Sequence, residues 1–182
     1  PANIDLHPNY VTNLTKWLLW QDPLIGLFDR HAADMDLTGH FPAIAERMAR
    51  YQKEYPDLAH LFAVTEKLCL VLDKKWDLGL RMKAAYDSGE RDRLRTIAEQ
   101  EIPELQQRIE ALREAHRAQW FSIYKPFGWE VIDLRYGGLL VRLKTTRARL
   151  LQYVNGETDR IEELETERLH FDGSWPAILT ML

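Results

Sequence analysis

The sequence has little of what would mark a secreted, metal-binding or nucleic-acid-binding protein. Its one cysteine, Cys69, rules out a disulfide framework, and a thiol within an apolar helical pattern is expected to be buried and inert. The formal net charge is −4, so no basic excess would draw the chain to nucleic acid or to an anionic membrane surface. The given residues show neither a signal-peptide pattern nor an apolar run long enough to span a bilayer. We therefore expect neither nucleic-acid nor membrane partners, and a cytoplasmic location.

The motifs that usually carry catalysis are also missing. His-Glu-x-x-His does not occur, and the six histidines are scattered along the chain. Gly-x-Ser-x-Gly, Gly-x-Gly-x-x-Gly and a phosphate loop are all absent. A metal-dependent bundle enzyme would need carboxylates and imidazoles that converge from several helices, and the sequence does not offer that pattern. We predict no catalytic residue, no metal site and no cofactor in this chain.

What the sequence does contain is helical periodicity. Apolar residues recur at i, i+3 and i+4 in three long stretches, which open at Pro56, at Pro103 and within residues 125–143. The first of these is expected to form a continuous rod of about 30 residues. Asn155-Gly156 ends the last one, because both residues tolerate the left-handed conformation of a helix C-cap. We predict an all-α fold: a bundle of three long antiparallel helices, with shorter helices and an irregular N-terminal arm.

The arm is predicted to span residues 1–41, and the bundle residues 42–182. The arm has no sustained period, but it is rich in large apolar side chains and is broken by Pro23 and Gly26. Such a segment cannot be a solvated linker, so it must lie against this domain or against another one. The chain begins with Pro-Ala-Asn rather than Met, and we expect it to be a piece of a larger protein.

Residues 125–143, KPFGWEVIDLRYGGLLVRL, combine charged and aromatic residues with a glycine pair. Glu130 and Asp133 fall at a helix N-terminus, where anions are favoured, so capping explains them. They also fit a surface that contacts another domain or reaches a sugar. Gly137-Gly138 costs roughly 1 kcal/mol per glycine relative to alanine. Another backbone that packs closely against the glycine pair would offset this cost. That backbone would belong either to a neighbouring helix, which is the interpretation we favour, or to another domain.

Two segments of the chain resemble a known family. TKWLLWQDPLIGLFD near the start and KPFGWEVIDLRYGGLLVRLKTTRARLLQYVNGETDRIEELETERL near the end are similar to the C-terminal helical domain of bacterial glycoside hydrolase family 20 enzymes. The most specific motifs are Leu-Trp-Gln-Asp-Pro-Leu at residues 19–24, Lys-Pro-Phe-Gly-Trp-Glu and Asp-x-Arg-Tyr-Gly-Gly. They occur in the right order, and the likeness covers nearly the whole chain.

The resemblance implies an activity that belongs to another part of the protein. These enzymes are exo-β-N-acetylhexosaminidases in which a (β/α)8 barrel carries an adjacent Asp-Glu pair. The Glu is the general acid, and the acetamido group of the substrate is the nucleophile. No Asp-Glu pair occurs in this chain, so no catalytic residue can be carried over. We predict that the isolated chain is inactive, whereas its parent protein is a β-N-acetylhexosaminidase.

The resemblance further implies a non-catalytic accessory domain, and it suggests two sets of contact residues. The domain would brace the barrel of the same chain and contribute to a homodimer or to the active-site wall, and an aminosugar would meet it only in the full-length enzyme. The predicted contact surface for substrate or barrel consists of Trp129, Glu130, Asp133, Arg135 and Tyr136. The predicted interface with the barrel or a dimer mate consists of Trp17, Trp20, Leu24 and Phe28. The alternative is an independent helical scaffolding module that binds a partner helix or a small ligand.

Overall fold

A computed structural model describes residues 4–7, 10–12 and 14–169, with side chains from residue 15 onward. β1 (Ile4–His7) and β2 (Tyr10–Thr12) pair as a short antiparallel hairpin. The other elements are helices: α1 (Leu14–Trp20), α2 (Asp29–Ala32), α3 (His40–Glu54), η1 (Pro56–Leu58), α4 (Ala59–Lys75), α5 (Leu78–Asp87), α6 (Arg91–Thr96), η2 (Ile97–Glu101), α7 (Ile102–Ile123), α8 (Trp129–Val154) and α9 (Glu162–Glu165). The predicted all-α class is confirmed. The end of the predicted bundle, residues 170–182, lies outside the described residues.

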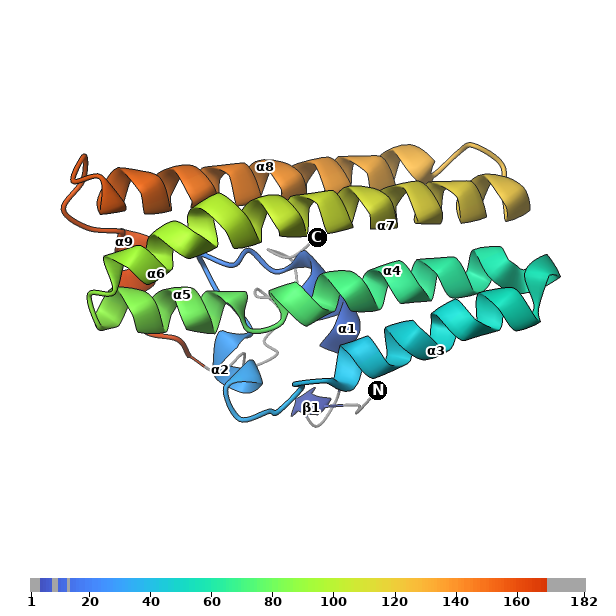
Figure 1. The fold of residues 1–182 in the computed structure, drawn as a ribbon, viewed down its shortest axis with the longest axis horizontal. Helices are drawn as coiled ribbons and strands as arrows, with labels where there is room; N and C mark the ends of the chain where they lie inside the picture. The colour runs from blue at the N-terminus through green and yellow to red at the C-terminus, as the bar shows by residue number, and fades with distance from the viewer. Residues whose placement is uncertain (1–3, 8–9, 13, 170–182) are drawn as a thin grey trace.

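The long helices lie side by side and alternate in direction (Figure 1). α3 and α4 form one antiparallel pair, α7 and α8 form a second, and α4 packs against α7. α5 continues beyond α4 to the end of the molecule where α6 and α9 lie. No helix in the described part of the chain has both the length and the apolar character needed to cross a membrane.

Two helix boundaries differ from the sequence prediction. The predicted rod from Pro56 is interrupted, because α4 ends at Lys75 and α5 begins only at Leu78. Conversely, α6, the π-helical η2 and α7 follow one another without a break, although Pro103 was predicted to begin a new helix. Pro103 is tolerated there because it lies in the first turn of α7, directly after the π-helical η2.

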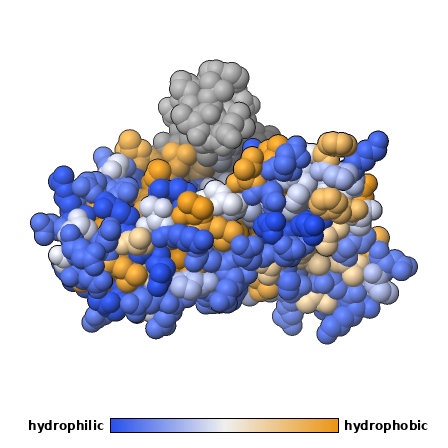
Figure 2. Space-filling view, turned by 90° about the horizontal axis from the view of Figure 1, so that it is seen from above, coloured by the Kyte–Doolittle hydropathy of each residue, from blue (hydrophilic) through white to orange (hydrophobic). Residues whose placement is uncertain are grey.

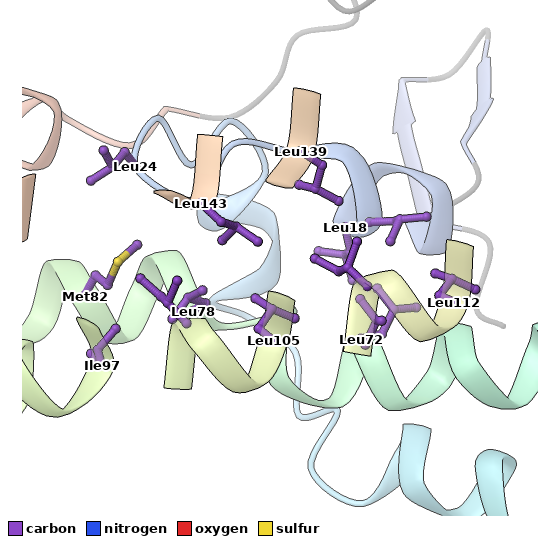
Figure 3. Packing of buried hydrophobic residues seen from close by; sticks show 14 of the residues in the cluster. Leu18, Leu24, Leu72, Leu78, Met82, Ile97, Leu105, Leu112, Leu139 and Leu143 are labelled. Atoms are coloured by element: carbon purple, nitrogen blue, oxygen red, sulfur yellow. The ribbon is translucent and has the colours of Figure 1, made fainter. Parts of the chain in front are cut away.

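Buried apolar side chains form one cluster along the bundle (Figure 3). α8 contributes Tyr136, Leu139, Leu143 and Leu150, which follow the helical period and fix which face of α8 is buried. The predicted arm also contributes: Leu18 of α1 is fully buried in the same cluster. The arm is thus less irregular than its sequence suggests, because α1 and α2 form within it.

Candidate functional site

The predicted contact surface at the start of α8 is partly an interior. Trp129 and Tyr136 are buried, and both contact His116 of α7. The ring centroids of Trp129 and His116 are 5.4 Å apart with perpendicular planes, and the Tyr136 hydroxyl lies 3.1 Å from Nδ1 of His116. Burial lowers the pKa of His116 and raises that of Tyr136, so the ring is neutral near pH 7 and Nδ1 can accept from the hydroxyl.

The charged members of this set have different surroundings. Glu130 accepts a hydrogen bond of 2.8 Å from the backbone N–H of Gly128, which fits its expected capping role. Asp133 accepts a hydrogen bond of 2.7 Å from Nε of Arg113 and so ties α8 to α7. Arg135 is half-buried, and its guanidinium forms no hydrogen bond or ion pair with a described residue. Of the five predicted residues, Arg135 therefore has a charged group without a partner among the described residues, and Glu130 keeps an exposed carboxylate.

The predicted arm interface also divides into interior and surface. Leu24 and Phe28 are fully buried within this chain, so they present no surface to another domain. Trp17 and Trp20 are half-buried, and each contacts another aromatic ring. The structure brings the two predicted sets together, because the ring centroids of Trp20 and Tyr136 lie 5.2 Å apart.

Gly137 and Gly138 face open space. A Cβ atom built on either residue would meet no described atom within 4 Å. The favoured interpretation, a close contact with a neighbouring helix of this chain, is therefore wrong for the part of the chain that the structure describes. The physical reason is that both glycines lie on the side of α8 opposite its buried residues.

Sequence analysis missed a buried polar cluster that joins the arm to the bundle. We define the connector cluster as Gln21, Asp29, Lys75 and Arg168. Lys75 is almost fully buried, and its Nζ donates to the backbone oxygens of Leu18 at 2.8 Å and Gln21 at 2.7 Å. Its position on α4 gives a signal in the sequence, since Lys75 occurs three residues after the buried Leu72 and so on the same helix face.

Asp29 is the counter-charge of the connector cluster. Its side chain is fully buried, with Oδ2 3.4 Å from Nε of Arg168 and Oδ1 3.4 Å from the donor nitrogen of Gln21. Burial raises the pKa of Asp29, although the charges of Arg168 and Lys75 oppose that shift. Burial also lowers the pKa of Lys75 from 10.5 to about 7, against the attraction of Asp22 and Asp29. Desolvation thus dominates at both groups.

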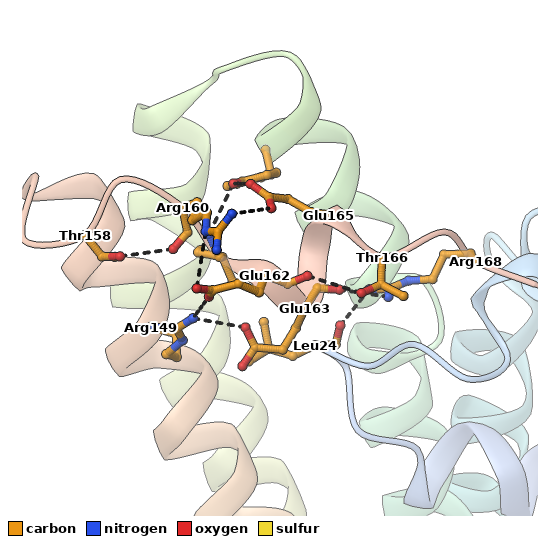
Figure 4. A network of polar contacts seen from close by, with 11 residues as sticks. Leu24, Arg149, Thr158, Arg160, Glu162, Glu163, Glu165, Thr166 and Arg168 are labelled. Carbon is orange, nitrogen blue, oxygen red and sulfur yellow. Dashed lines mark hydrogen bonds and ion pairs between the residues drawn. The ribbon is translucent and has the colours of Figure 1, made fainter.

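Arg168 joins the segment after α9 to Leu24 of the arm and to Glu163 (Figure 4). Its Nη2 donates to the backbone oxygen of Leu24 at 2.6 Å, and its Nη1 donates to that of Glu163 at 3.1 Å. Glu163 in turn forms an ion pair of 3.1 Å with Arg149 of α8. Three distant parts of the chain, the arm, α8 and the segment around α9, are held together by these contacts.

Two glycines make room for the Asp29 carboxylate. A Cβ atom on Gly26 or Gly79 would lie 2.1 or 2.2 Å, respectively, from Oδ2 of Asp29. Because the carboxylate is buried, it cannot swing into solvent to relieve such a clash. The interruption between α4 and α5 sets Gly79 at this place in the structure.

Replacing Gly79 with alanine is expected to lower the free energy of unfolding by about 2–3 kcal/mol, since overpacking forces its neighbours to shift. Urea denaturation measures the change. Asp29→Ala provides the control, because it removes the atoms that the new methyl group would contact. In the Asp29→Ala background the cost of Gly79→Ala should fall well below its cost in the wild type. Equal costs in both backgrounds would contradict the proposed clash.

The described residues offer little chemistry of their own. No group of three or more His, Cys, Asp or Glu side chains between residues 15 and 169 is arranged to hold a metal ion. Burial raises the pKa of Cys69, which keeps its thiol protonated and weakly nucleophilic. Asp29 and Lys75 have shifted pKa values, but both are sealed from solvent. Their arrangement serves to hold segments of the chain together.

Comparison with known proteins adds one match. A family model described as the Glycoside Hydrolase 20C C-terminal domain matches residues 2–178. No curated protein matches the chain. The matched range includes both the predicted arm and the predicted bundle.

Proposed function

Because the chain belongs to the Glycoside Hydrolase 20C C-terminal domain family, we propose that it is a non-catalytic accessory domain of a β-N-acetylhexosaminidase. The observation that carries the proposal is the family match over residues 2–178, which takes in the arm together with the bundle. The domain would brace the catalytic domain of the same chain, and the aminosugar would bind chiefly to that catalytic domain. The cytoplasmic location expected from the sequence stays a prediction.

The geometry supports a bracing role in two ways. The connector cluster anchors the segment from Leu18 to Asp29 to α4 and to Arg168, so a domain attached before this segment would be held by a rigid support. The end of α7 and the turn after it also present exposed aromatic side chains, with Phe121 44% and Tyr124 60% exposed. Exposed aromatic groups of this kind are typical contact residues between domains.

The proposal predicts a division of labour that can be measured. The protein that carries this domain and its catalytic domain should release the chromophore from a chromogenic N-acetyl-β-hexosaminide, whereas the chain of 182 residues should release none. Circular dichroism must first show that the isolated chain is folded and helical. Hydrolysis by the isolated chain would refute the non-catalytic role, and an inactive full-length protein would refute the assignment to this activity.

Arg135 offers a specific probe of the domain contact. In the full-length enzyme, Arg135→Ala should lower kcat/KM or accelerate thermal inactivation by about tenfold, because a charge-assisted hydrogen bond contributes about 1.5–3 kcal/mol. Trp129→Ala is a weaker probe, since Trp129 is buried and its loss would also disturb the core. Arg160→Ala is the matched control, because Arg160 is exposed near α9, at the opposite end of the bundle. If Arg135→Ala behaves like the wild type, as Arg160→Ala should, Arg135 makes no such contact.

Self-association is the second part of the proposal. Several large apolar side chains are exposed on α8, on the end of α7 and on the turn between them. Such side chains favour association with another protein surface. A homodimer would remove them from water and would double the number of catalytic domains in one particle.

A further inference from the structure

α8 is apolar on two opposite faces. One face supplies buried core residues, among them Leu139 and Leu143. The opposite face, together with Phe127 two residues before the helix, carries an outward stripe at spacings of three and four residues: Phe127, Val131, Leu134, Gly138 and Val141. Leu134 is 76%, Val141 58% and Val131 51% exposed. A surface helix normally exposes a polar face to solvent. The outward stripe of α8 is instead apolar, and it has no partner among the described residues.

The view onto α8 agrees with this pattern. Figure 2 looks at the molecule from above α8, and hydrophobic side chains stand between hydrophilic ones along this face. Gly137 and Gly138 lie midway along the outward stripe, and nothing described fills the space next to them. Helix axes usually approach to about 8–10 Å, depending on the side chains between them. Because glycine has no side chain, a glycine pair lets the axis of a second helix approach to the shortest distance of that range.

The charges beside the stripe indicate how a second helix would run. Glu130 stands near the start of α8 and Lys144 in its second half; both are exposed, and on a helical wheel both fall on the same side of the stripe. Neither forms an ion pair with a described residue. Measured along the helix from the point between Gly137 and Gly138, the two residues are equally distant to within one residue, or about 1.5 Å.

We propose that the outward stripe of α8 binds the same stripe of a second copy of this chain, antiparallel, with the two helices crossing at Gly137-Gly138. This deepens the proposed self-association and depends on it. An antiparallel pair places Glu130 beside Lys144 of the partner subunit, twice by symmetry. A parallel pair would place each charge and its own copy on opposite sides of the contact, where neither meets an opposite charge. The antiparallel arrangement therefore gives two attractive contacts that the parallel one lacks.

The apolar residues fit the same symmetry. Leu134 would pack against Val141 of the partner subunit, next to the crossing point. Phe127, at the edge of the stripe, would lie opposite Ala148 of the partner subunit, so a large side chain meets a small one. Each stripe fills the other without a change in the described fold, because all of these groups already face outward.

Sedimentation velocity on the full-length protein over a range of concentrations tests the proposal. The wild type should dimerise, and Leu134→Glu should weaken the dimer at least about a hundredfold, because it buries two unpaired charges. Leu58→Glu is the matched control: Leu58 is exposed too, but it lies in η1, between α3 and α4, and the dimer should persist.

A charge swap tests the antiparallel direction. Glu130→Lys or Lys144→Glu alone should weaken the dimer about tenfold, since each creates two like-charge contacts. The double variant should regain affinity close to that of the wild type. Circular dichroism checks that each variant is folded, since Glu130 also accepts from the Gly128 N–H.

Three results would overturn the inference. A dimer that is unaffected by Leu134→Glu would leave the proposed self-association intact but would refute α8 as its surface. A double charge variant that is weaker than both single variants would refute the antiparallel direction. A wild type that stays monomeric at all concentrations would refute both the α8 interface and the self-association, while the accessory role would still rest on the activity of the full-length enzyme.

Discussion

Replacing Asp29 with alanine is expected to lower the free energy of unfolding by about 3–5 kcal/mol, the usual cost of removing one partner from a buried ion pair. The side chain of Asp29 is fully buried and faces Nε of Arg168 at 3.4 Å. Its loss would leave the guanidinium of Arg168 in the interior without its counter-charge, and likewise the ammonium of Lys75 in those molecules that still hold this proton at pH 7. The methyl group of alanine would also leave a cavity in the connector cluster.

Urea denaturation at pH 7 measures this loss, and Asp34→Ala supplies the matched control. Asp34 belongs to the same segment of the chain and forms an ion pair of 3.3 Å with Arg30. Both partners of that pair are exposed, with side-chain exposures of 42% and 67%, so its removal should cost no more than about 1 kcal/mol. If the two variants lost equal stability, the burial of Asp29 would have no energetic consequence, and the interpretation of the connector cluster would fail.

Lys75 should make the free energy of unfolding rise with pH between about 7 and 10.5, the limits set by its folded and ordinary pKa values. In this interval the unfolded chain still holds a proton that the folded chain has released. Raising the pH favours the state with fewer bound protons, which here is the folded one. A shift of this size corresponds to a gain on the order of 5 kcal/mol across the interval.

Lys75→Met separates this effect from the titration of other groups. The variant lacks the amine but retains Cys69 and the tyrosines, which titrate in the same interval and cancel when the two unfolding curves are subtracted. The difference in unfolding free energy, wild type minus Lys75→Met, should rise steadily from pH 7 to pH 10. A difference that does not change with pH would show that Lys75 keeps an ordinary pKa and that its Nζ is solvated.

These two predictions concern the attachment of the arm to the bundle. Lys75 holds the backbone of α1 and Gln21 from α4, whereas Arg168 holds Leu24 from the other end of the chain. Weakening either contact should loosen the segment by which the domain would be joined to its catalytic domain. In the full-length enzyme, Asp29→Ala should therefore make thermal inactivation faster as well as lower the stability of the domain.

The structure also redistributes the roles that the sequence assigned to its aromatic residues. Trp129 and Tyr136 were predicted as contact residues, but they pack around His116 in the interior. An aromatic residue at a helix start has the same sequence pattern whether a second helix covers it or not. The exposed aromatic residues of the hairpin tip, Tyr124 and Phe127, were not selected, because their local sequence carries no sign of their exposure.

The sequence by itself determined the helical class, the family and the absence of the family's catalytic pair. The reason is that the helical periodicity of apolar residues and short sequence motifs are local properties of the chain. Only the tertiary structure decided which charges are buried and which glycines are free. Lys75 and Leu18 are 57 residues apart, and Arg168 and Leu24 are 144 apart, so no local pattern could indicate their contact. Desolvation depends on every segment that packs around a group, and those segments come together only when the chain folds.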